Sequence, residues 1–83
     1  NILILDLAGK TYRGERTASR CFTPQCRGPY RNVARHDRRH VVAGRAELAA
    51  SDGERLQCRW VEYRDAAQGE CMAADGASYR IRR

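Results

Sequence analysis

The most constraining feature of this chain is its C-terminal third, residues 56–81, which contains two cysteine-bearing apolar runs and a third run after an Asp-Gly pair. The first run, L-Q-C-R-W-V-E-Y, carries Cys58, and the second, G-E-C-M-A, carries Cys71. Side chains alternate between the two faces of a strand, so Leu56, Cys58 and Trp60 share one face of the first run. The pattern predicts three short antiparallel strands, with one cysteine on each of the first two.

The length of the chain makes a covalent staple expected. A chain of 83 residues forms one domain, residues 1–83, and its core is marginal because a small domain buries only part of the surface that its unfolded form exposes. The chain has one Phe, one Trp and one Met, so large apolar side chains are few. The residues expected in the core are Ile2, Ile4, Leu5, Leu7, Tyr12, Val42, Leu48, Leu56, Trp60, Tyr79 and Ile81.

The four cysteines are the candidate staples. An even number of cysteines in so short a chain indicates disulfides in an oxidising compartment or a metal site in a reducing one. Cys58 and Cys71 lie on neighbouring predicted strands, and a disulfide between them would close a loop of about thirteen residues and contribute on the order of 3 kcal/mol. Buried free thiols and metal ligation are the alternatives for this pair.

Alternating apolar runs, bounded by turn residues, mark the other strands. In chain order, the pattern predicts a strand over 2–7, a turn at 8–10, a strand over 11–18, a strand over 41–50, a type I′ turn at Asp52-Gly53, a loop over 65–69, a short strand over 70–73, a turn at Asp75-Gly76 and a strand over 78–82. The predicted fold is therefore all-β, a small antiparallel meander or partly open barrel of five to six short strands.

The segment between the second and third predicted strands has a different composition. Two prolines and a glycine argue against both a helix and a central strand in residues 19–30, so an ordered loop is expected there. A disulfide between Cys21 and Cys26 would close a small ring within this loop. The following residues, 31–40, are highly charged and predict either one short helix or a solvated loop.

The same cysteines also belong to a candidate zinc site. Cys21 and Cys26, with His36 and His40, have the spacing C-x4-C-x9-H-x3-H, in which two thiolates and two imidazoles could bind zinc tetrahedrally. The spacing resembles that of the bacterial Ros/MucR type of zinc finger, and R-N-V-A-R-H-D-R-R-H resembles the basic helix that such a finger presents to DNA. The cysteines are farther apart here than in that family. The resemblance implies a cytoplasmic, zinc-dependent nucleic-acid-binding protein.

Charge and polar residues supply no candidate active site. The formal net charge of +6 comes from fifteen Arg and one Lys, and such a surface attracts polyanions, nucleic acid included, or is simply solvated. No serine lies in a G-x-S-x-G motif, and the only Gly-spaced segments are predicted hairpin turns rather than phosphate-binding loops. We therefore expect no catalytic residue and no enzyme activity, and no cofactor other than zinc in the alternative above.

The C-terminal pattern resembles one that recurs in small uncharacterised exported proteins and lipoproteins of Gram-negative bacteria. There a strand ending L-x-C-x-W is followed by G-x-C, a D-G or similar turn and an aromatic-led final strand, as in residues 44–81 here. The resemblance implies an all-β fold, a disulfide between Cys58 and Cys71, and residence in the periplasm or at the outer membrane. We therefore expect a non-enzymatic exported domain that binds a protein or has a structural role in an envelope assembly.

The N-terminal residues carry no visible targeting signal. Residues 2–7 are apolar but far too few to span a bilayer, and no signal peptide precedes them in the sequence. A signal peptide or lipid anchor, if the protein has one, is expected to come before Asn1.

Overall fold

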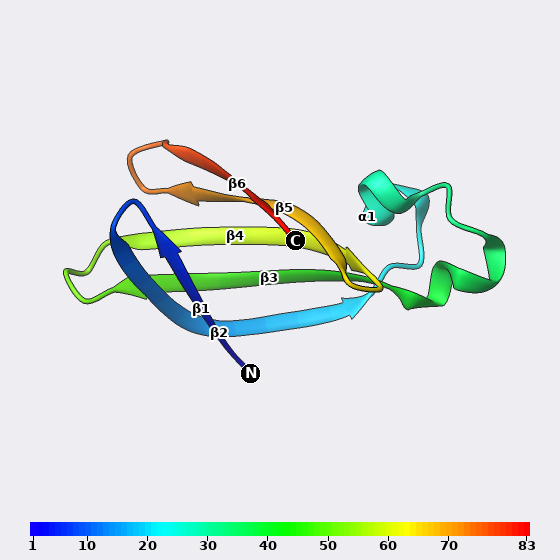
Figure 1. The fold of residues 1–83 in the computed structure, drawn as a ribbon, viewed down its shortest axis with the longest axis horizontal. Helices are drawn as coiled ribbons and strands as arrows, with labels where there is room; N and C mark the ends of the chain where they lie inside the picture. Colours follow the sequence, from blue (N-terminus) through cyan, green and yellow to red (C-terminus); the bar gives the residue numbers. More distant parts are fainter.

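Six antiparallel strands follow one another in chain order and form one curled, open sheet (Figure 1). The structure is a computed structural model and describes all residues from 1 to 83. The strands are β1 (Ile2–Leu7), β2 (Lys10–Arg20), β3 (Val41–Ala50), β4 (Arg55–Tyr63), β5 (Ala66–Ala73) and β6 (Ser78–Arg82). Each strand pairs with its neighbours in sequence, so the predicted all-β antiparallel meander is confirmed.

The β3–β4 hairpin turn differs from the predicted one. The Ala50 N–H donates to the Glu54 carbonyl at 2.9 Å, so the loop holds three residues, and among them only Gly53 has a positive φ, of 88°. The Asp52 carboxylate accepts a hydrogen bond from the Glu54 N–H at 3.0 Å. This local bond stabilises a turn in which the φ of Asp52 is not positive. The predicted type I′ turn at Asp52-Gly53 is therefore wrong. The two-residue turn with positive φ at both positions lies at residues 8–9 instead.

Strand β5 begins earlier than the sequence predicts. The predicted loop over residues 65–69 is wrong, because only Arg64 and Asp65 separate β4 from β5, and Tyr63 pairs with Ala66 across them. Alanine, glutamine and glycine have low intrinsic strand preference, but regular pairing with β4 along the whole segment stabilises the extended conformation. The sheet therefore extends farther toward the β2–β3 connection than expected.

One face of the sheet, which we call the core face, carries the hydrophobic core. Its buried members are Tyr12, Ala46, Leu48, Leu56, Cys58, Trp60, Cys71 and Ala73, against which Leu3, Leu5, Leu7, Tyr79 and Ile81 are partly buried. The predicted core positions Ile2 and Ile4 are wrong, because both side chains are exposed on the opposite face. Residues 2–5 are all apolar, so the pattern does not distinguish the inward set. Pairing of Leu5 with the buried core residue Tyr12 decides it.

Trp60 lies flat against the core face between two glycines. The strand register places Gly44 of β3 and Gly69 of β5 directly opposite Trp60 of β4. A Cβ atom at Gly44 would lie 2.3 Å from the indole Cε2, so the ring occupies the space above that glycine. The large indole is only 7% exposed because both neighbouring positions lack side chains that would displace it.

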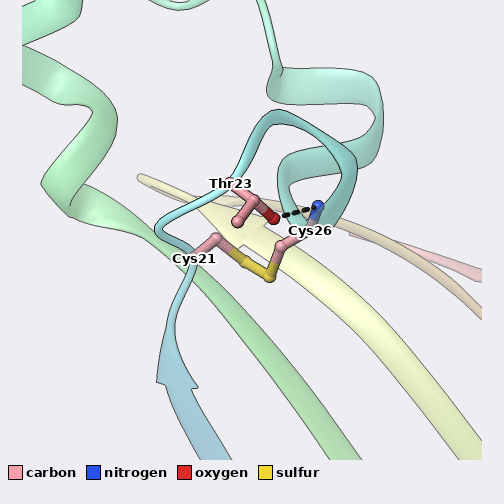
Figure 2. The surroundings of a disulfide bond; sticks show 3 residues. All are labelled: Cys21, Thr23 and Cys26. Atoms are coloured by element: carbon pink, nitrogen blue, oxygen red, sulfur yellow. Dashed lines mark hydrogen bonds between the residues drawn. A yellow bond between two sulfur atoms is a disulfide. The ribbon is translucent and has the colours of Figure 1, made fainter.

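The long connection between β2 and β3 contains three short helical segments: α1 (Pro24–Arg27) and the 3-10 helices η1 (Gly28–Tyr30) and η2 (Arg35–His40). The expectation of no helix in residues 19–30 is wrong, because proline is compatible with the first helical position, where Pro24 lies. Thr23 caps α1, since its Oγ1 accepts a hydrogen bond from the Cys26 N–H at 3.3 Å (Figure 2). In residues 31–40, the helical alternative is the one that forms.

This connection folds over one end of the second face of the sheet, which we call the outer face. By alternation Val41 points to the outer face, and it is fully buried on that face. The predicted core residue Val42 is only partly buried. A Cβ atom on Gly28 would lie 3.8 Å from Cγ2 of Val61, so η1 rests directly on β4. No helix of the chain has the length and apolar character that crossing a membrane requires.

Candidate binding site on the outer face

A groove of about 1080 Å³ lies on the outer face, beside the folded connection. Side chains from five neighbouring strands, β2 to β6, form its floor. Its rim is formed by Gln25, Cys26, Gly28 and Pro29 of α1 and η1. The groove therefore joins the disulfide-closed loop to the polar face of the sheet.

Arginine side chains gather in the floor of this groove. The strand register places Thr17, Arg45, Arg59, Glu70 and Arg80 in one row across β2, β3, β4, β5 and β6. An ion pair joins Arg59 to Glu70, with 3.1 Å between Nη2 and Oε1. Arg45 and Arg80 form no ion pair. The row thus has three cations and a single anion.

The charge arrangement of the row is unfavourable in the isolated domain. Arg45 and Arg59 are directly opposite each other on β3 and β4, and like charges in such cross-strand positions repel. Arg82 in the next row adds an exposed arginine without an ion pair, so four arginines line the groove against one glutamate. This positive surface attracts carboxylates and phosphates, which guanidinium groups bind through two parallel hydrogen bonds.

A disulfide fixes the rim of the groove. Cys21 and Cys26 are bonded to each other within the loop that precedes and begins α1 (Figure 2). Cys21 is buried, and its N–H donates to the Val41 carbonyl at 3.0 Å, which ties the ring to the start of β3. The rim residues are therefore held both covalently and by the sheet.

A second set of contacts holds the rest of the connection. The Tyr63 hydroxyl donates to Asp37 Oδ2 at 3.0 Å, and this hydrogen bond lowers the pKa of the Asp37 carboxyl below its ordinary value. The Tyr63 ring centroid lies 5.7 Å from that of Tyr30, and the Arg64 guanidinium carbon is 5.3 Å from the Tyr63 ring centroid. One tyrosine of β4 therefore contacts both η1 and η2.

Arg27 is a buried cation within the same loop, and sequence reasoning did not identify it. It follows the rim residue Cys26 in α1, is 4% exposed, and has a side-chain Nε without a hydrogen-bond partner. Solvent screens a buried charge less than an exposed one, so Arg27 adds to the positive potential of this region. Its burial distinguishes Arg27 from the solvated arginines around it, and nothing in the residue pattern predicts that burial.

The structure does not assemble the candidate zinc site. The sulfurs of Cys21 and Cys26 are bonded to each other, and in that state neither is a thiolate that can bind zinc. His36 and His40 are exposed on η2. No group of three or more His, Cys, Asp or Glu side chains is placed to hold a metal ion.

Cys58 and Cys71 form the second disulfide of the structure. They are directly opposite each other on β4 and β5, and both are almost completely buried on the core face. No free cysteine remains. This disulfide is part of the hydrophobic core, on the side of the sheet opposite the arginine row.

The arginines of the groove were not predicted as a site. Alternation directs Arg45, Arg59, Arg80 and Arg82 away from the core face, which the sequence indicates. Their assembly in neighbouring rows depends on the register of four strands, which no single run of sequence contains.

Comparisons of the chain with protein-family models, with curated proteins and with solved structures found no match. Interpretation of the groove therefore depends on its own geometry and charge.

Proposed function

We propose that this chain is an exported, non-enzymatic domain that binds an acidic segment of a protein partner in the bacterial envelope, in the periplasm or at the outer membrane. The two disulfides favour an oxidising compartment and so support export. The sequence pattern of residues 44–81, which resembles one in small exported proteins and lipoproteins, is the reason for placing the chain in the envelope. The groove on the outer face is the proposed binding surface.

The opposition of Arg45 and Arg59 is the observation that carries this proposal. A carboxylate placed between the two guanidinium groups would relieve their repulsion and accept charge-assisted hydrogen bonds from both. Arg45 on β3 and Arg80 on β6 are separated by three strand spacings, about 14 Å. That length corresponds to about four residues of extended chain, so an extended acidic segment matches the row better than a single small anion.

Titration with a hexaglutamate peptide tests the proposal. We expect the amide and arginine side-chain resonances of the groove to shift in NMR spectra, and binding to weaken at high salt. In the double variant Arg45→Glu and Arg80→Glu, binding is expected to weaken tenfold or more, because one charge-assisted hydrogen bond contributes about 1.5–3 kcal/mol. Both side chains are exposed, so the fold is retained.

A matched control separates the groove from the overall charge. The double variant Arg38→Glu and Arg55→Glu has the same net charge, and both residues are exposed and lie outside the groove lining. It is expected to keep most of the affinity. Equal weakening in the two double variants would contradict the proposed site. Equally tight binding of an oligothymidylate would also contradict it, because the surface would then select any polyanion.

A further inference from the structure

Strand β1 has one edge without a partner. It is the first strand of the open sheet and pairs only with β2. The Arg16 N–H donates to the Asn1 carbonyl at 3.0 Å, and backbone bonds in an antiparallel pair alternate along the strand. Leu3, Leu5 and Leu7 therefore direct their backbone groups to β2. The N–H and C=O groups of the intervening even-numbered residues point to the free edge.

No side chain of β1 prevents another strand from pairing with this edge. Five of its six residues are Ile or Leu, and the only charged one, Asp6, accepts a hydrogen bond from Thr11 Oγ1 at 2.7 Å. Sheets usually block an exposed edge with lysine, arginine, proline or a bulge, and β1 has none of these. The other edge strand, β6, carries Arg80 and Arg82. Of the two edges, only β1 is suited to accept another strand.

We propose that two copies of this chain pair through β1, as antiparallel neighbours, to form a dimer with a continuous sheet of six strands from each copy. A two-fold axis perpendicular to the sheet at Ile4 keeps the core faces of both copies on one side of the joined sheet and their outer faces on the other. It places Ile4 opposite Ile4 of the second copy, and Leu3 opposite Leu5. These central pairs are apolar, and toward each end Ile2 lies opposite Asp6 of the second copy. The outward backbone groups of the even-numbered residues meet one another.

The self-complementarity of β1 is what selects a second copy as the occupant. The central residues Leu3, Ile4 and Leu5 are apolar and match themselves about the two-fold axis, so a second copy of β1 can cover them. The contact also leaves the proposed binding groove free, since β1 pairs with residues 10–15 of β2, whereas Thr17 and Ser19 of β2 line the groove. One six-residue strand from each copy makes a small interface, so the dimer is weak and forms with rising concentration.

Sedimentation velocity of the full chain, from micromolar to millimolar concentration, tests the proposal. The mass is expected to rise from 9.4 kDa toward twice that value. Ile4→Lys is expected to stay monomeric, because the two ammonium groups would meet at the axis. The control is Met72→Lys on the inner strand β5, where Met72 is 51% exposed and Ile4 is 58% exposed. This control is expected to dimerise like the unchanged chain.

Amide hydrogen exchange provides a second readout that needs no variant. The amides of Ile2, Ile4 and Asp6 are expected to exchange rapidly in dilute solution and to be protected at high concentration. An unchanged chain that remains monomeric at millimolar concentration would overturn the proposal, as would dimerisation of Ile4→Lys equal to that of Met72→Lys. Absence of concentration-dependent protection at these three amides would overturn it as well.

Discussion

Replacing Trp60 with alanine is expected to lower the free energy of unfolding by about 3–5 kcal/mol, the usual cost of deleting a buried aromatic side chain. The indole lies above Gly44, a residue with no side chain of its own to fill the space. A domain of this size has a total stability of about 4–12 kcal/mol, so the loss would remove a quarter or more of it.

Phe22 is the matched control for this substitution. Its ring is 84% exposed in the β2–β3 connection, so Phe22→Ala is expected to change stability by no more than about 0.5 kcal/mol. Urea unfolding followed by far-UV circular dichroism measures both variants without relying on the single tryptophan. Equal stabilities for the two variants would show that Trp60 does not hold the core together.

Removing the disulfide between Cys58 and Cys71 has the second-largest expected effect. The two cysteines are 13 residues apart, and the chain-entropy model assigns a ring of this length about 3 kcal/mol. The double variant Cys58→Ala and Cys71→Ala should therefore show a clearly lower urea midpoint. Its Trp60 side chain remains, so fluorescence can follow the transition.

The second disulfide provides the comparison for this measurement. Cys21 and Cys26 are 5 residues apart, and the same model assigns this shorter ring about 2 kcal/mol. Alanine at both positions is therefore expected to cost less stability, and the change is expected to be concentrated in the connection rather than in the sheet. A larger loss from the shorter ring would contradict the role of the Cys58–Cys71 disulfide as the main staple of the core.

The two faces of the sheet have different proposed roles, stability for the core face and binding for the outer face. The core face holds Trp60 and one disulfide, and its contacts stabilise the domain. The outer face holds the arginine row, and the second disulfide fixes the loop that borders it. Because the arginines of the groove are exposed and point away from the core, they can be changed with little effect on the fold.

Clear alternation made part of the fold predictable from the sequence. The predicted strands over residues 41–50 and 78–82 have the same bounds as β3 and β6, and the runs that carry Cys58 and Cys71 lie on adjacent strands. Polar and apolar residues alternate over residues 45–48, 55–60 and 78–82, so the inward face is evident there.

Where alternation is absent, tertiary contacts decide. Residues 2–5 are apolar throughout, and only pairing with β2 shows that the leucines rather than the isoleucines face the core. The start of β5 depends on pairing with β4 rather than on the preferences of Ala66, Ala67 and Gly69. Burial of Val41 and Arg27 depends on how the connection folds back, a non-local contact that period-two alternation does not encode.

The candidate site was the least predictable feature. Its arginines lie on β3, β4 and β6, at positions where the sequence indicates only that they face water. Cys21 and Cys26 stand out in the sequence because their spacing fits two kinds of chemistry, a disulfide ring and a zinc site. Choosing between these two chemistries requires the oxidation state of the sulfurs, which no spacing reveals.

Measuring the oxidation state of the four cysteines is the most direct test of an exported, disulfide-bonded domain. Protein isolated from the cells that make it naturally, with thiols alkylated at lysis, should carry no alkyl label in its intact mass. Two disulfides should leave the unreduced chain four hydrogens lighter than the reduced chain. Four alkylated cysteines, or one zinc ion bound per chain, would contradict an exported domain stapled by two disulfides.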